Sequence, residues 1–120
     1  MATSAARTIG ATLVDLLEVV RGRVPLIDRD VAVATGVAED QVAAWTDRRA
    51  TPRDNEAARL GALLAVVERL EVSTKPEAIP DWLNRSVPLL DGQTPLATMA
   101  AGDYQRVAAI AEDFIYTPFT

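Results

Sequence analysis

The sequence predicts an all-α protein of about six or seven helices in two modules, residues 1–72 and residues 73–120. Apolar residues recur at helical spacing along most of the chain, and no segment alternates with a period of two for long enough to form a strand. Glycines, prolines and good capping residues divide these stretches into pieces of helical length. Helices packed on helices are therefore the expected architecture.

The first helix is expected to end near Gly22. It carries apolar residues at i, i+4, i+7, i+8 and i+11, a spacing that a helix places on one face. This stripe consists of Ile9, Leu13, Leu16, Leu17 and Val20.

Two shorter helices should follow the break at Pro25. Asp28 can cap a helix that runs through Thr35 and is closed by Gly36. The next helix is expected from about residue 38 to residue 48, before a break at residues 51–52.

The fourth helix begins near Asp54 or Asn55, both of which are good capping residues. It carries the strongest amphipathic stripe of the chain, so we expect it to lie in the core. The stripe consists of Leu60, Leu63, Leu64, Val67 and Leu70.

The second module begins at residues 73–77, where Thr74 and Glu77 have the spacing of a capping box. The helix that follows carries Trp82 and Leu83 and ends by Pro88. Trp82 can supply a large core anchor.

Turn and capping residues then define two more helices. Gly92 marks a turn, and Thr94 with Pro95 suits the cap and first residue of a short helix that ends before Gly102. Asp103 can cap the last helix, and residues 116–120 are expected to form an extended tail.

The composition excludes several classes of chemistry. The chain has no cysteine and no histidine, which removes thiolate and imidazole metal ligands, cysteine nucleophiles and the usual general base. Lys75 is the lone lysine, and the pair Glu68 and Glu71 is expected to face solvent. We therefore expect no catalytic residue, no metal and no cofactor, and an enzyme is a distant third interpretation.

No apolar run approaches the roughly 18 residues that span a bilayer, and the N-terminus lacks the profile of a secretion signal. A cytoplasmic protein without a membrane partner is expected. The net charge of −5 opposes DNA binding. The charge is unevenly distributed. Residues 1–75 hold ten basic and eleven acidic residues, a net charge of −1. Residues 76–120 hold two basic and six acidic residues, a net charge of −4.

A helix-turn-helix is indicated by the residues between Asp28 and Asp47. Two helices that cross steeply over a short turn need a small crossing residue and a positive φ in the turn, which Ala32 and Gly36 provide. Val42 and Trp45 then face inward. The run from Val31 to Val37, followed by Val42 and Trp45, resembles the Xre-type regulators. The resemblance implies that the helix after the turn enters the major groove.

Gln41 is the best candidate for reading a base edge, since its amide can pair with adenine. Arg48, Arg49 and Arg53 follow the helix and could contact phosphates, with a solvated basic turn as the alternative. Glu39 and Asp40 would repel DNA at the same helix start, although acids in a first turn stabilise any helix. Operator binding is thus expected to be weak for one copy and to need a dimer or a complex.

The second module carries a more distinctive pattern. Trp82 is followed by the run from Asp91 to Leu96, which contains Gly92 and Pro95, and then by the run from Gly102 to Val107. In this order, behind an Xre-like helix-turn-helix, these residues resemble the toxin-binding domain of Xre/MbcA/ParS-type antitoxins over roughly residues 25–115.

The resemblance implies an antitoxin that neutralises a RES-domain toxin, an enzyme that degrades NAD⁺, and that represses its own operon. It also implies that the C-terminal end of the antitoxin covers the active site of the toxin. The matching residues here are Phe114, Ile115, Tyr116, Thr117, Pro118, Phe119 and Thr120. A homodimer, or a larger complex with the toxin, is expected.

The C-terminal segment is unusual on physical grounds too. Three of the six aromatic residues of the chain lie in its last seven positions, as expected for a partner-binding anchor. Pro118 limits the entropy lost on docking. The alternative is that the segment packs on its own helices or on a second copy.

Two functional interpretations remain open. The first is an antitoxin that occludes a toxin and represses transcription as a complex. The second is a stand-alone helix-turn-helix regulator without a toxin. The acidic second module and its aromatic end favour the first, because a protein that only binds DNA needs neither.

Overall fold

The computed structural model describes the backbone of residues 2–72 and 74–116, and the side chains of residues 9–72 and 74–112. Within this part of the chain there are seven α-helices, two short 3-10 helices and no strand, which confirms the predicted all-α class. The α-helices are α1 (Ala2–Arg21), α2 (Asp28–Thr35), α3 (Glu39–Thr46), α4 (Asn55–Glu71), α5 (Ile79–Leu83), α6 (Pro95–Ala100) and α7 (Tyr104–Tyr116). The 3-10 helices are η1 (Pro76–Ala78) and η2 (Pro88–Leu90).

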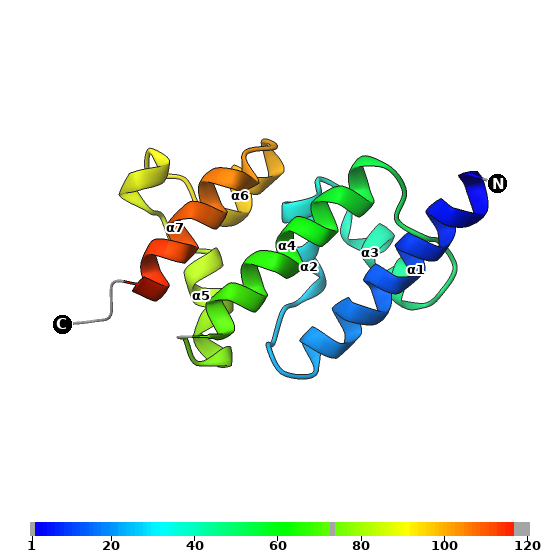
Figure 1. Ribbon diagram of the computed structural model, residues 1–120, viewed down its shortest axis with the longest axis horizontal. Helices are drawn as coiled ribbons and strands as arrows, with labels where there is room; N and C mark the ends of the chain where they lie inside the picture. The colour runs from blue at the N-terminus through cyan, green and yellow to red at the C-terminus, as the bar shows by residue number, and fades with distance from the viewer. Residues whose placement is uncertain (1, 73, 117–120) are drawn as a thin grey trace.

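Helix α4 lies at the centre of the molecule. It packs against α1 on one side and against α7 on the other, and α2 packs against α3, α4 and α6 (Figure 1). The predicted stripe of α4 is confirmed, since Leu60, Leu63, Leu64, Val67 and Leu70 are all buried. Figure 1 shows the consequence of this order: α1 and the end of α7 lie at opposite ends of the molecule.

One continuous hydrophobic core extends through both halves of the chain. It includes Leu17 of α1 and Trp45 of α3 as well as Leu96 of α6 and Val107 of α7. Burial of each such side chain contributes about 1.5–3 kcal/mol relative to an exposed one. The two halves therefore stabilise one another through α2, α4, α6 and α7.

The apolar stripe predicted for α1 is wrong at two positions. Leu17 and Val20 are buried as expected, but Ile9 and Leu16 are exposed. The buried face instead passes through Gly10, which lies so close to the loop between α3 and α4 that a Cβ there would overlap the carbonyl oxygen of Pro52. Helix α1 therefore packs with the side that carries Gly10 and not with the side that carries Ile9 and Leu16.

Two predicted caps are also corrected. Asp28 is the first residue of α2, and the helix start is capped by Asp30, whose Oδ2 accepts a hydrogen bond from the Ile27 N–H at 3.2 Å. Thr74 does not cap the next helix, because the N-cap residue of η1 is Lys75 and no side chain caps it. The Thr74 N–H instead donates to the Leu70 carbonyl at 2.9 Å, at the end of α4. The Thr94 cap is confirmed, because its Oγ1 accepts from the Ala97 N–H at 3.0 Å.

The last helix is longer than predicted, since α7 includes Tyr116, which was expected to begin an extended tail. Among the residues that the structure describes, no helix is long and apolar enough to cross a membrane.

Candidate partner-binding surfaces

The turn between α2 and α3 is built around Gly36. Its φ of +76° is left-handed, and its N–H donates to the Ala32 carbonyl at 2.8 Å. A side chain at Gly36 would also meet the Arg59 guanidinium. Ala32, Val42 and Trp45 are buried in the core, whereas Gly36 is exposed in the turn.

The exposed side of α3 is acidic. Glu39 and Asp40 in its first turn and Asp47 at its C-terminal cap are exposed, and α3 itself contains no basic residue. At 100° per residue these three positions share one side of the helix, together with Ala43. Gln41 lies on a different side, so the acidic side of α3 does not present the predicted base-reading residue.

Three of the four predicted DNA-binding residues lie together. Gln41, Arg49 and Arg53 line one surface depression of about 480 Å³, whose remaining lining residues are Ala50, Thr51 and Glu56. Arg49 Nη2 lies 3.2 Å from Asp47 Oδ2, an exposed pair that is easily exchanged for another anion. The depression is thus a polar surface beside α3 with two guanidinium groups.

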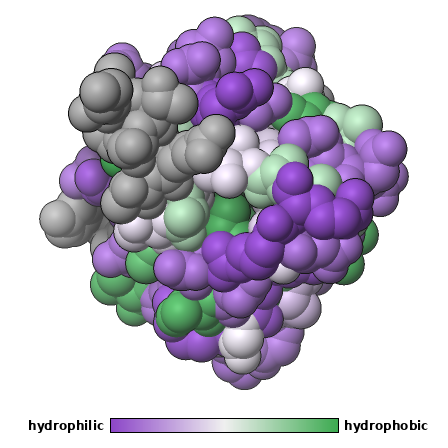
Figure 2. Space-filling view, turned by 90° about the vertical axis from the view of Figure 1, so that its right-hand side faces the viewer, coloured by the Kyte–Doolittle hydropathy of each residue, from purple (hydrophilic) through white to green (hydrophobic). Residues whose placement is uncertain are grey.

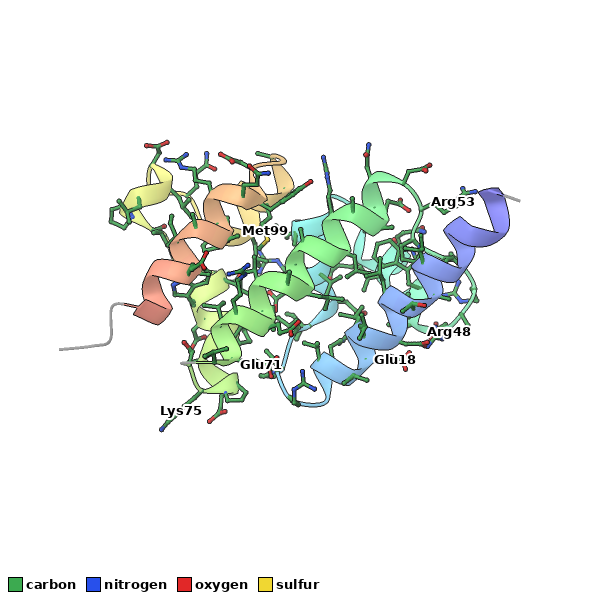
Figure 3. The ribbon with its side chains drawn as sticks, in the orientation of Figure 1. Glu18, Arg48, Arg53, Glu71, Lys75 and Met99 are labelled. Carbon is green, nitrogen blue, oxygen red and sulfur yellow. The ribbon has the colours of Figure 1, made fainter. Side chains whose placement is uncertain are left out.

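Arg48 is not part of this depression. Its Nη2 lies 2.6 Å from Asp15 Oδ1 and 3.4 Å from Glu18 Oε1, so it joins the loop after α3 to α1. Figure 3 shows Arg48 beside Glu18 and well apart from Arg53. The backbone of Arg48 has a φ of +63°, a conformation that turns the chain out of α3.

The glycines of the second half form two turns around α6. Gly92 and Gly102 have φ values of +81° and +91°, and a Cβ at either would meet nothing within 4 Å. The requirement at both positions is therefore conformational and not steric. Between them, Pro95 is buried as the first residue of α6.

The loop before α6 is fixed to α7 by Arg106. Its Nη2 donates to the Leu89 carbonyl at 2.8 Å and lies 3.4 Å from Asp91 Oδ2. Within the loop, the Val87 N–H donates to the Gln93 carbonyl at 3.0 Å. Sequence reasoning did not identify this role, because Arg106 and Leu89 are 17 residues apart along the chain.

The two halves are also joined by polar contacts. Asp30 is buried, and its Oδ1 accepts a hydrogen bond from Asn84 Nδ2 at 3.1 Å. Arg69 of α4 lies 3.3 Å from Glu112 of α7. Sequence reasoning assigned no role to any of these residues.

One curated protein shares much of this sequence. The chain is 35% identical over 86 residues to the "Probable mycobacterial cidal antitoxin Rv3188" of Mycobacterium tuberculosis, and the match covers 72% of this chain and 73% of the relative. The chain belongs to the MbcA-type antitoxin family. Family membership gives it the role of an antitoxin in a toxin–antitoxin system. No family model and no solved structure matches the chain.

In this MbcA-type antitoxin, the predicted toxin-binding residues follow directly on the packed part of α7. Val107 and Ala111 are buried, and α7 packs along α4. Phe114, Ile115 and Tyr116 belong to α7, but their side chains lie outside the described residues, as do residues 117–120 altogether.

Proposed function

We propose that this antitoxin binds and neutralises a RES-domain toxin that degrades NAD⁺, and that residues 114–120 block the active site of that toxin. Residues 73–120 act as the toxin-binding module and residues 1–72 as a helix-turn-helix module.

The observation that carries the proposal is the placement of α7. Its first turns are held by the buried Val107 and Ala111 and by the contact of Glu112 with Arg69, and it runs on to Tyr116 at the end of the molecule opposite α1. A rigid, packed helix presents the residues at its end at a lower entropic cost than a free chain does. The aromatic content of residues 114–120 supplies the anchors that such an interface needs.

Co-expression with the product of the adjacent gene tests the proposal. We expect the two proteins to purify together, and we expect the toxin to lose its NAD⁺-cleaving activity in the complex. A neighbouring product that neither binds this chain nor cleaves NAD⁺ would contradict the proposed partner and favour the stand-alone regulator.

Operator binding is a second function, supported by the depression that Gln41, Arg49 and Arg53 line. Two guanidinium groups beside an amide suit contacts to phosphates and to a base edge. The acidic side of α3 makes deep insertion of this helix into the major groove of DNA unfavourable. We therefore propose that the protein contacts DNA through the polar depression beside α3 and binds weakly as a single copy. Filter binding to the promoter DNA of its own operon, against an unrelated DNA of equal length, tests this function.

A further inference from the structure

Asp54, in the loop before α4, adopts a backbone conformation that strongly favours glycine. Its φ is +52° and its ψ is −119°. These are the angles of the first central residue of a type II′ turn, a position that glycine usually occupies. The hydrogen bond of such a turn is present, since the Glu56 N–H donates to the Arg53 carbonyl at 3.0 Å. A residue with a Cβ is strained in this conformation, and strain of this kind is a feature of many functional sites.

The turn separates two neighbours of opposite charge. Arg53 lines the polar depression beside α3, whereas Asp54 lines a groove against α1 together with Ile9 and Leu13. Asp54, the acid next to Arg53 in the chain, is therefore not among the residues that line the depression.

The turn also engages the acid that does line the depression, Glu56. The Glu56 Oε1 accepts a hydrogen bond from the Arg53 N–H at 3.4 Å, so this carboxylate is used by the backbone of the turn. Within the described part of the chain, no carboxylate lies at ion-pair distance from the Arg53 guanidinium, whereas Arg48 and Arg49 each have an acidic partner. The charge of Arg53 is thus available to an anionic partner outside the protomer.

The chain on the other side of Arg53 is held by packing. Pro52 is buried, and its carbonyl lies so close to α1 that a Cβ at Gly10 would overlap it. Arg53 therefore lies between a packed residue and a closed turn, which lowers the entropy lost when its side chain binds. Figure 3 shows Arg53 near the start of α1, and Figure 2 looks onto this end of the molecule, where hydrophilic surface surrounds smaller apolar patches. A polar, charged partner suits this surface.

We propose that Asp54 is a positioning residue for operator binding: its turn holds the Arg53 guanidinium in the depression, where it donates to a phosphate of the DNA backbone. This inference rests on the proposed operator binding and adds to it the residue that sets the direction of one phosphate contact. A guanidinium held in one orientation matches the geometry of two phosphate oxygens. Asp54 itself does not touch the DNA.

Two uncharged substitutions separate the conformation of Asp54 from its charge. Asp54→Gly favours a positive φ and keeps the turn, whereas the β-branched side chain of Asp54→Val opposes it. The probe is the promoter DNA of the protein's own operon, and the salt slope is that of the logarithm of the binding constant against the logarithm of the salt concentration. Asp54→Gly should bind at least as tightly as the wild type, because the turn remains and a charge that repels DNA is gone. Asp54→Val should bind roughly 5- to 10-fold more weakly than Asp54→Gly, with a salt slope lower by about one.

The same exchange in an Arg53→Ala background shows whether Asp54 acts through Arg53. There the glycine and valine variants should differ by less than about twofold in binding, because the side chain that the turn positions is absent. Thermal unfolding gives an independent readout of the strain: Asp54→Gly should melt about 5 °C above the wild type. If Asp54→Val does not fold, Asp54→Ala takes its place in both backgrounds.

The outcomes separate this inference from operator binding itself. A wild type that binds the promoter DNA, with an Asp54→Val variant that keeps the affinity and salt slope of Asp54→Gly, would overturn the role of Asp54 and leave operator binding intact. A loss of equal size in the Arg53→Ala background would also overturn it, because Asp54 would then not act through Arg53. A wild type that does not bind the promoter DNA would overturn operator binding and this inference together.

Discussion

The carboxylate of Asp30 accepts a hydrogen bond from the side-chain amide of Asn84 at 3.1 Å, and this contact joins the start of α2 to the end of α5. The second oxygen of the same carboxylate accepts the Ile27 N–H at 3.2 Å. One buried side chain thus caps a helix of the first half and holds a helix of the second half. A buried carboxylate is tolerated because both of its oxygens are hydrogen-bonded.

Replacing this carboxylate should destabilise the whole fold. Asp30→Ala removes a helix cap and leaves the Asn84 amide without this acceptor, so we expect the free energy of unfolding to fall by about 2–3 kcal/mol. The control is Asp28→Ala, two residues earlier, which removes a half-buried ion pair with Arg21 at the protein surface and should cost less than about 1 kcal/mol. Urea unfolding measures both. Equal losses would show that Asp30 does not link the halves.

Two glycine substitutions on packed helices should have opposite effects. Gly10→Ala forces a methyl group against the backbone of Pro52 and the side chain of Thr51, which we expect to cost about 1–3 kcal/mol through a shift of that loop. Gly61→Ala in the middle of α4 meets its nearest atom, Leu13 Cδ2, at 3.7 Å, an ordinary contact. It should stabilise the protein by about 0.5–1 kcal/mol, since alanine favours a helix interior. Melting curves compare them, and a stabilising Gly10→Ala would contradict the close approach.

The arginines that follow α3 should separate into two groups. Arg49→Ala with Arg53→Ala should weaken operator binding and lower the salt slope by about two, because both side chains line the depression and the exposed pair of Arg49 with Asp47 can be exchanged for a phosphate. Arg48→Ala should change the slope little, because that side chain is engaged by Asp15 and Glu18 of α1.

The measurement is the logarithm of the binding constant against the logarithm of the salt concentration. A slope that depends on Arg48 as much as on the other two would mean that Arg48 leaves α1 to bind DNA. An unchanged salt slope in all variants would show that DNA does not contact the depression.

Much of the helical order could be predicted from local signals. The leucine stripe of α4, the cap at Thr94 and the positive φ at Gly36, Gly92 and Gly102 each depend on residues within one or two turns of the chain. Such features are specified by spacing and backbone conformation alone.

The predictions that were wrong concern positions where the local sequence suits two outcomes and tertiary contacts decide between them. Helix α1 has apolar residues on two sides, and the smallest residue, Gly10, marks the side that approaches Pro52. Asp28 and Asp30 are both chemically suited to cap α2. The structure uses Asp30, which also contacts Asn84, a residue 54 positions further along the chain. Arg48 likewise finds its partner Asp15 on a helix 33 residues earlier. Pairings of this kind leave no periodic signal in the sequence.

We propose above that the end of α7 and the residues after it inactivate the toxin. The most direct measurement is NAD⁺ cleavage by the purified toxin in the presence of the full antitoxin and of a variant truncated after Asp113. We expect the full chain to abolish cleavage, and the truncated chain to keep its helical circular dichroism but leave the toxin active. A truncated chain that inhibits the toxin as well as the full chain would contradict it.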